Sequence, residues 1–375
     1  MNKEPLVSVI MGVYNTKIEY LRIAMDSILH QTYRNLEFII IDDASDQWCA
    51  AFLEEYKNKR ETEYGDRRIR LFHNERNKGL TVSLNIALRM AKGNYIARMD
   101  ADDISLPQRI SKQISYMEAH KDIDVLACGS FIYGGEPLFP TEKDFTDSPR
   151  FAGIYRKFEQ ERMRVRLSFA NIEFTHPTVV FRSSFLRENH LQYDESIHKA
   201  QDYNMWVRCI EKGKLDSLQE VLFISREFGE RIGNHELKGQ TSFADVTKVM
   251  CLKRLLPQVN VSEEKLYIWM RDTKMSGSVT DNRKLIQRLV KANDLKKEYD
   301  LKVYRQEIFF WWMRKGLYRK NWPFGIRMLI APYMFLNILR IGFPQTCRYG
   351  KDLIYKRKIK KRWAVEMTGY GEYRV

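Results

Sequence analysis

The sequence has few cysteines, and none of them are spaced as metal-binding or redox pairs. Its five cysteines in 375 residues stand alone, without a Cys-x-x-Cys pair. This excludes a zinc ribbon and a thioredoxin-type site, and it argues against an extracellular disulfide framework. The N-terminal apolar run is short, follows an acidic residue and is not followed by a small-residue cleavage site. We therefore expect no signal peptide and reduced thiols in the cytosol.

Two glycine-rich phosphate-binding motifs are also missing. No Gly-x-Gly-x-x-Gly follows the first apolar run, which disfavours a dinucleotide oxidoreductase. No Gly-x-x-x-x-Gly-Lys-Ser/Thr occurs, which disfavours a P-loop NTPase. A nucleotidyltransferase would need a glycine-rich, basic loop after the first strand, and GVYNTK at 12–17 has one glycine and one lysine. A bound nucleotide would therefore be held by carboxylates and backbone groups.

The composition is that of a globular chain with an uneven distribution of charge. Hydrophobic residues make up 44% and charged residues 30%, so the chain is not disordered, and its length allows two domains. The net charge is +15, but residues 303–375 hold 16 Lys and Arg against 4 Asp and Glu, together with four of the seven tryptophans. A lipid headgroup layer is a better partner for such a tail than nucleic acid, because it is both anionic and partly apolar.

The least charged part of this tail is too short to cross a membrane. MLIAPYMFLNIL at 328–339 has 12 residues and contains Pro332, whereas a spanning helix needs about 20 residues. We therefore expect a segment within about 303–362 to lie on an anionic membrane surface. The alternative is a buried, helical C-terminal core.

The first half of the chain alternates strand and helix patterns. Such alternation predicts an α/β fold with a mostly parallel sheet flanked by helices. Ligands of these sheets bind beyond the carboxyl ends of the strands. Two acidic clusters, Asp42-Asp43 and the group at 100–103, follow predicted strands. The predicted strands are 6–11, 36–41, 68–73, 95–99 and 124–128.

The pattern changes in the second half of the chain. We expect a strand at 174–181, interrupted by Pro177, a helix at 202–213 and a last strand at 218–225. Beyond about residue 233 every periodic segment is helical. We therefore expect one domain at 1–232 and a helical, basic, aromatic-rich region at 233–375.

The acidic motif Asp-Ala-Asp-Asp at 100–103 is typical of a metal site. Adjacent carboxylates repel one another unless a cation neutralises them, and Mg²⁺ or Mn²⁺ commonly binds one or two carboxylates together with phosphate oxygens. An EF-hand is excluded, because Ser105 and Ser111 occupy the positions that need Gly and Glu. The alternative is a helix start that favours acidic residues, since Pro107 opens the next helix.

Several motifs occur in the order found in family 2 glycosyltransferases. Over about residues 5–230 the chain resembles this family, in particular its bacterial members that assemble capsule, exopolysaccharide or lipopolysaccharide. The resemblance implies the GT-A fold and an inverting sugar transfer. The motifs are VSVIMGVYN at 7–15, IIIDDAS at 39–45, NKGLTVSLNIAL at 77–88, YIARMDADD at 95–103, LPQRISKQ at 106–113, HPTVVFR at 176–182 and AQDYNMWVRCIEKG at 200–213.

The resemblance also implies roles for residues that would bind the donor. Asp43 would read the nucleotide base. Asp102 would be the direct ligand of a divalent metal, Mn²⁺ or Mg²⁺, and Asp100 would lie toward the ribose and diphosphate as a second ligand. Asp103 would contact the donor sugar. The nucleotide pocket would be completed by Gly12, Val13, Tyr14, Asn77, Gly79 and Asn85.

The same resemblance places the catalytic base at Asp202. Family members often have Glu-Asp there, whereas this chain has Gln201 before Asp202, which removes one negative charge beside the base. An aspartate at a helix start is also an ordinary N-cap. His176 either lies near the diphosphate or acceptor or is a structural residue. Arg109 either pairs with a carboxylate of the acidic loop or supports packing.

These features predict a metal-dependent, inverting glycosyltransferase. It would move a sugar from a nucleotide donor, expected to be UDP-linked, to a glycan acceptor such as a lipid-linked oligosaccharide, in surface polysaccharide synthesis. We expect it in the cytoplasm, held peripherally on the inner face of the cell membrane, without a nucleic-acid partner. The alternative from another class is a membrane- or nucleic-acid-binding module whose acidic clusters are only structural.

Overall fold

The structure is a computed structural model that describes residues 4–134, 138–140, 144, 150–153, 159–171, 174–227, 243–270 and 277–317. These residues form two compact units. The sheet unit holds the described residues up to 153 and those at 174–227. The helical unit holds 159–171, 243–270 and 277–317. The predicted boundary at 232 lies outside the described residues and stays a prediction.

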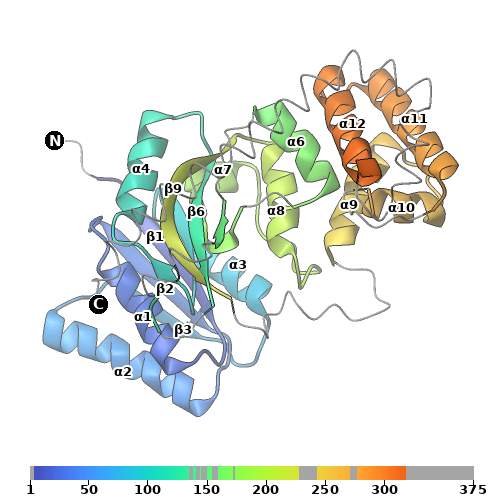
Figure 1. The fold of residues 1–375 in the computed structure, drawn as a ribbon. Helices are drawn as coiled ribbons and strands as arrows, with labels where there is room; N and C mark the ends of the chain where they lie inside the picture. The colour runs from blue at the N-terminus through green and yellow to red at the C-terminus, as the bar shows by residue number, and fades with distance from the viewer. Residues whose placement is uncertain are drawn as a thin grey trace. The chain divides into compact units, whose positions relative to one another are not determined.

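The sheet unit is built on a mixed sheet with the order β3-β2-β1-β4-β8-β6-β9-β5, and β7 pairs with β6 (Figure 1). Neighbours among β1 to β4 are parallel, as are β6 and β9, whereas β8 runs antiparallel between β4 and β6. The predicted α/β fold is therefore confirmed. The strands are Val7–Val13, Leu36–Asp42, Ile69–His73, Tyr95–Asp100, Ile104–Ser105, Val125–Tyr133, Arg150–Ala152, Val180–Arg182 and Leu215–Arg226 (β1 to β9).

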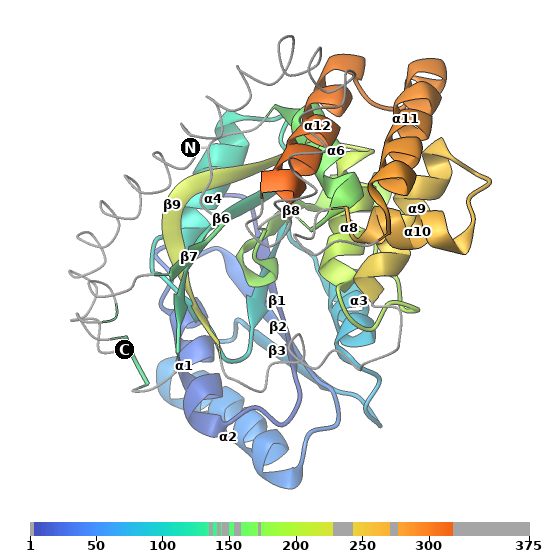
Figure 2. The same cartoon turned by 45° about the vertical axis from the view of Figure 1, so that its right-hand side comes forward.

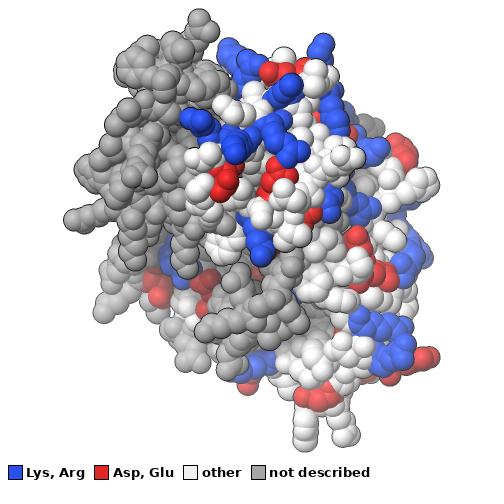
Figure 3. All heavy atoms as spheres, turned by 90° about the vertical axis from the view of Figure 1, so that its right-hand side faces the viewer, with Lys and Arg blue, Asp and Glu red and all other residues white. Residues whose placement is uncertain are grey.

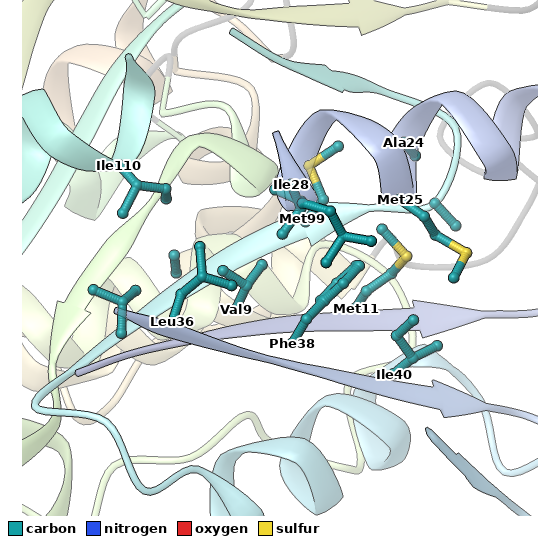
Figure 4. Packing of buried hydrophobic residues seen from close by; sticks show 14 of the residues in the cluster. Val9, Met11, Ala24, Met25, Ile28, Leu36, Phe38, Ile40, Met99 and Ile110 are labelled. Atoms are coloured by element: carbon teal, nitrogen blue, oxygen red, sulfur yellow. The ribbon is translucent and has the colours of Figure 1, made fainter. Parts of the chain in front are cut away.

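Helices cover the sheet because its central strands are apolar at nearly every position. Residues of β1 and β2 such as Met11 and Phe38 pack against Met25 and Ile28 of α1 and lie in one cluster with Ile110 of α4 (Figure 4). The helices of this unit are α1 (Ile18–Leu29), α2 (Gln47–Tyr64), α3 (Leu80–Met90), α4 (Arg109–Ala119), α7 (Ser183–Glu188) and α8 (Gln201–Ile210).

The strand register brings three chain segments to one edge of the sheet. Gly12 of β1 pairs with Asp100 of β4, and Val13 pairs with Asp42 of β2. The backbone N–H of Asp43 donates to the carbonyl of Val13 at 2.8 Å. The carboxyl ends of β1, β2 and β4 therefore meet, as expected for parallel strands, and we call this the site edge.

The strand predicted at 174–181 is wrong for most of its length. A 3₁₀ turn covers His176–Thr178, and only the three residues of β8 (Val180–Arg182) join the sheet. Pro177 explains the difference, because its ring fixes φ and it has no N–H to donate to a neighbouring strand. The turn keeps His176 out of the sheet and directs it toward the site described below.

The helical unit contains a helix from the middle of the chain. This helix, α6 (Gln160–Phe169), packs its Val165 and Phe169 into the core of the C-terminal helices. Arg162 Nη1 lies 2.5 Å from Glu307 Oε1, and both side chains are buried. Sequence periodicity did not show that 159–171 leaves the sheet unit. The other helices are α9 (Phe243–Leu255), α10 (Val261–Ile268), α11 (Val279–Lys296) and α12 (Leu301–Leu317).

The beginning of the predicted membrane segment lies inside this helical core. Val303, Tyr304, Ile308 and Trp311 of α12 are all buried there. For these residues the alternative of a packed core is correct, because their apolar side chains face α6 and α11. The rest of the segment, including 328–339, lies outside the described residues.

Within the described part of the chain, no helix is both long and apolar enough to span a membrane. On the face drawn in Figure 3, basic side chains lie in several separate groups among acidic and uncharged ones. The described surface on this face is therefore mixed in charge. The strong positive excess belongs to the sequence after residue 317, with 13 Lys and Arg against 3 Asp and Glu.

Candidate active site

Asp43 lies at the site edge and fixes the loop that leads into α3. Its Oδ1 accepts hydrogen bonds from Asn74 Nδ2 at 2.7 Å and from the N–H of Lys78 at 2.9 Å. Its Oδ2 accepts from the N–H of Gly79 at 2.7 Å. Gly79 has φ of 87°, which suits glycine. The carboxylate is buried, and its oxygens keep lone pairs beyond these bonds, so a base N–H can still be accepted.

The other residues predicted for the nucleotide pocket lie on the same loops. Gly12 and Val13 end β1, and Tyr14 follows with 54% of its surface exposed. Asn77 is exposed, and its Oδ1 accepts from the N–H of Gly79 at 3.1 Å. An exposed aromatic ring at the end of a strand suits a flat nucleotide base. Their roles in binding stay predictions.

Three residues with positive φ flank the predicted site. Asn15, Ala44 and Ala200 have φ of 48°, 59° and 57°. Asn15 lies in the loop after β1, Ala44 comes directly after Asp43, and Ala200 comes directly before α8. Non-glycine residues adopt this conformation rarely, and where they do the strain is often found at functional sites. The surrounding packing therefore holds all three loops in place.

The acidic motif forms a compact cluster. Asp100, Asp102 and Asp103 each offer a carboxylate oxygen, and these atoms lie within 4.8 Å of one another. Carboxylate oxygens at this spacing are ligands suited to Mg²⁺ or Mn²⁺, so the residues present fit the predicted metal. Asp100 and Asp102 are partly exposed, whereas Asp103 is fully buried.

Asp103 has a structural role that its sequence position did not reveal. Its Oδ1 accepts from the N–H of Arg226 at 2.8 Å, and its Oδ2 accepts from Ser225 Oγ at 3.4 Å. The carboxylate thus ties the acidic loop to the end of β9. Its contact with the donor sugar stays a prediction.

Two arginines that were not singled out from the sequence adjoin the cluster. Arg98 of β4 is 1% exposed and forms an ion pair with Asp100. Arg226 is fully buried, and its Nη1 donates to the carbonyl of Asp102. For Arg98 the sequence did contain a signal, because it is a charged residue inside the apolar run YIARM of β4. A buried charge needs a partner.

Arg109 supports this arrangement from α4. Its Nη2 donates to the carbonyl of Arg98 at 2.9 Å, its Nε donates to Gln113 Oε1 at 3.0 Å, and its guanidinium carbon lies 5.1 Å from the centre of the Phe223 ring. Burial lowers the pKa of Arg109 to about 10, so it stays charged at neutral pH. Of its two predicted roles, support of packing is the one that its hydrogen bonds favour.

Asp202 is the second residue of α8, and its Oδ1 accepts from the N–H of Tyr203 at 2.7 Å. A position in the first turn favours the ionised carboxylate, because the helix dipole is positive there. In Figures 1 and 2, α8 and α3 lie on the same side of the sheet. Asp202 is partly exposed, as a group that acts on a substrate must be.

Helix α3 holds the segment that leads to Asp202. Asn85 is fully buried, and its amide exchanges two hydrogen bonds of 2.9 Å with the backbone of Tyr193. Its Nδ2 also donates to Glu195 Oε1 at 3.0 Å, and Thr81 Oγ1 donates to the carbonyl of Ile197 at 3.2 Å. Asn85 therefore positions the 193–197 segment, and its place in the nucleotide pocket stays a prediction.

Tyr193 is a buried residue of the segment before α8. Burial raises the pKa of its hydroxyl; Arg98 opposes this, and the negative charges of Asp202 and Asp100 raise the pKa further. The turn that holds His176 packs on β4, and the His176 ring lies 6.0 Å from the Trp206 ring of α8. Helix α8 therefore approaches β4 through this turn, while Asp43 borders the site edge through Val13.

His176 contacts this group as a neutral, packed residue. Its Nε2 lies 2.8 Å from the Tyr193 hydroxyl, and its ring is 5.4 Å from the Tyr193 ring and 6.0 Å from the Trp206 ring. Burial of the imidazole, together with the charge of Arg98, holds its pKa well below the ordinary value. These contacts favour the structural alternative over a role at the diphosphate.

Comparisons with known proteins agree with this geometry. The profile of the family described as glycosyl transferase family 2 matches residues 8–187. An uncharacterized glycosyltransferase of Methanocaldococcus jannaschii is 37% identical over 222 residues, which are 58% of this chain and 70% of that protein. The O-antigen biosynthesis glycosyltransferase WbnJ of Escherichia coli is 30% identical over 220 residues, 58% of this chain and 78% of that protein.

A solved structure shows the same fold at low sequence identity. The crystal structure of S. aureus TarS 1-349 in complex with UDP-GlcNAc matches with a TM-score of 0.52 and 16% identity, and the match covers 82% of this chain and 88% of that one. This likeness shows a GT-A-like architecture, as expected from the sequence. Because of these sequence relatives and the order of its motifs along the chain, the protein belongs to glycosyl transferase family 2 and is a glycosyltransferase.

Proposed function

We propose that this glycosyltransferase transfers a sugar from a UDP-linked donor, with inversion, to a lipid-linked glycan in bacterial surface polysaccharide synthesis. The observation that carries the proposal is that Asp43 and the acidic cluster lie at one edge of the sheet, with α8 approaching β4 through the contact of Trp206 with His176. A UDP donor is supported by the similar fold of TarS, which was solved with UDP-GlcNAc. Polysaccharide synthesis is supported by the relative named for O-antigen biosynthesis.

The donor would lie across the carboxyl ends of β1, β2 and β4. Asp43 accepts an N–H of the base, and the backbone of 12–14 lines the same pocket. Asp102, with Asp100 beside it, would hold the divalent ion, which when bound neutralises the charge of the leaving diphosphate. Asp100 and Asp102 differ in their surroundings, because Asp100 already forms an ion pair with Arg98.

Asp202 is the general base of this proposal. An inverting transfer needs one group to take the proton of the acceptor hydroxyl as the hydroxyl attacks the sugar. A second carboxylic acid is not needed, because the leaving group is a phosphate and not an alkoxide as in glycoside hydrolysis. The first turn of α8 keeps Asp202 ionised, and the contacts of Asn85 and Thr81 hold the preceding segment in position.

Replacement of Asp202 tests the base directly. We expect D202N to lower kcat by about 10²–10⁴-fold, the usual contribution of a general base, and to leave UDP-sugar affinity nearly unchanged. UDP release against a panel of UDP-sugars and a lipid-linked acceptor extract measures kcat, and calorimetry measures binding. D194N is the matched control, because Asp194 lies in the segment before α8 and its Oδ1 accepts hydrogen bonds from the N–H and Oγ of Ser196. Equal loss of binding and turnover in D202N would contradict the assignment.

A further inference from the structure

We propose that a cavity at the end of β4 opposite to the site edge binds the phosphate monoester of a small polar molecule, such as a sugar phosphate. Strand β4 runs from Tyr95, which lines this cavity, to Asp100 at the site edge. A strand of this length spans roughly 16 Å. The cavity shares no residue with the proposed donor site, so the inference does not depend on the proposed function.

The cavity has the size of a small-molecule site and a polar lining. Its volume is about 420 Å³, and sites for small molecules commonly measure about 300–1,000 Å³. Among the lining residues that the structure describes, apolar surface comes mainly from Pro5 and the Tyr95 ring, so an acyl chain would find little to pack against. The lining residues are Pro5, Asn94, Tyr95, Glu118, Arg182, Ser184 and Arg187.

The carboxylate and amide acceptors of the cavity are already engaged. Glu118 Oε1 accepts from the Tyr95 hydroxyl, and Glu118 Oε2 accepts from Lys121 Nζ at 2.8 Å. The Asn94 Oδ1 accepts from the N–H of Leu6 at 3.1 Å. A ligand that mainly donates hydrogen bonds would therefore have to compete with bonds that the protein makes to itself.

The donors of the cavity, in contrast, are free. The side-chain amide N–H groups of Asn94, the hydroxyl of Ser184 and the guanidinium of Arg187 have no hydrogen-bond or ion-pair partner among the residues that the structure describes. These side chains come from the start of β4 and from α7. A ligand with several acceptor oxygens would satisfy all three, and a phosphate monoester offers three such oxygens and a charge near −2.

Arg182 supplies a second positive charge that is fixed in place. Its Nη1 donates to the Tyr95 hydroxyl at 2.9 Å, and its Nη2 donates to the carbonyls of Met117 and Ile123 at 3.2 and 3.0 Å. Its Nε is buried and has no hydrogen-bond partner in the described part of the chain. Together with Arg187, two guanidinium groups thus line the cavity against one carboxylate, which is itself paired with a lysine. This excess of positive charge suits a dianion.

Calorimetric titration of the full chain with three probes tests the class of ligand. We expect glucose 6-phosphate to bind, galacturonate to bind about tenfold more weakly because its carboxylate has one charge and two oxygens, and glucose not to bind measurably. Equal affinity for the three probes, or no binding of glucose 6-phosphate, would overturn the inference. So would tighter binding of galacturonate than of glucose 6-phosphate.

Variants of the lining residues test the place of binding. R187M should weaken the binding of glucose 6-phosphate by about tenfold or more, because a charge-assisted hydrogen bond is lost, and S184A should weaken it several-fold. E118Q should tighten it several-fold, because a charge of the same sign as the ligand is removed. R67M is the matched control, because Arg67 is exposed before β3 and does not line the cavity. Affinities of R187M and S184A equal to that of R67M would place the ester elsewhere and overturn the inference.

Discussion

At the scale of single residues, the carboxylates of the site differ in what their surroundings leave them free to do. Asp43 and Asp103 are buried and accept hydrogen bonds from loop or strand groups, so they shape the site edge. Asp100, Asp102 and Asp202 are partly exposed. The sequence places all five at strand or helix ends, and the structure adds that Asp43 and Asp103 also organise the backbone around the site.

The neutral His176 gives a prediction about acid stability. Its pKa is lowered in the folded protein, whereas in the unfolded chain it is near 6.5. Below that pH the unfolded chain binds a proton that the folded protein does not, so stability falls as the pH falls. At pH 5.5 the loss from this group is on the order of 1 kcal/mol relative to neutral pH.

Urea denaturation at pH 7.5 and 5.5 measures this loss. The decrease in the free energy of unfolding should be smaller by about that amount in H176Q than in the unchanged chain. H30Q serves as the control, because His30 is exposed at the end of α1. An equal pH dependence in H176Q and the unchanged chain would show that His176 titrates alike in both states.

At the scale of elements, helix α3 connects two functions that lie more than 100 residues apart in the chain. Its start is fixed by Asp43 through Gly79, and its middle holds Tyr193 through Asn85. The proposed nucleotide side and the proposed base side of the site are therefore joined by one helix. A local change in α3 should affect the position of Asp202 although the two do not adjoin in sequence.

Removal of the Asn85 amide tests this connection. N85A leaves the buried N–H and carbonyl of Tyr193 without their partner, so we expect a loss of about 2–4 kcal/mol in the free energy of unfolding. In the protein that remains folded, kcat should fall more than UDP affinity, since the segment before Asp202 is released. N189A is the control, because Asn189 donates only within α7 to Phe185 and should cost about 1 kcal/mol. Stability and kcat equal to the control would refute the role of this contact.

At the scale of the whole molecule, the chain does not divide at a single point. Helix α6 interrupts the sheet unit in sequence and joins the helical unit, where its arginines meet Glu307 of α12. When one partner of a buried ion pair such as Arg162 and Glu307 is lost, the fold is destabilised by about 3–5 kcal/mol. The helical unit therefore needs α12 intact, and a truncation that tests the tail has to begin after Leu317.

The basic tail gives a prediction about membrane binding. A chain that ends at residue 317 loses 13 Lys and Arg and 3 Asp and Glu. We expect it to bind vesicles with anionic lipid much more weakly than the full chain in a flotation assay, because each basic residue near such a surface contributes about 1 kcal/mol. A chain that ends at Glu366 keeps the basic residues up to Arg362 and should bind as the full chain does. Undiminished binding of the shorter chain would exclude the tail as the anchor.

The sequence by itself determined the order of strands and helices in the first half of the chain. Periodicity and apolar runs depend on neighbours in sequence, and these predicted β1 to β4 within a few residues. The acidic motif was identified from residue types and spacing, which are local, whereas the role of Asp202 was implied by the resemblance to the family. The strand at 174–181 failed where Pro177 formed a turn instead.

Only the tertiary structure decided which groups are buried together. The contacts of Arg98 with Asp100, of Arg226 with the acidic loop and of Asn85 with Tyr193 depend on how distant segments pack. The same is true of α6, whose short amphipathic sequence is compatible with either unit. Burial and pairing of charges are long-range properties, and a pattern of neighbouring residues does not contain them.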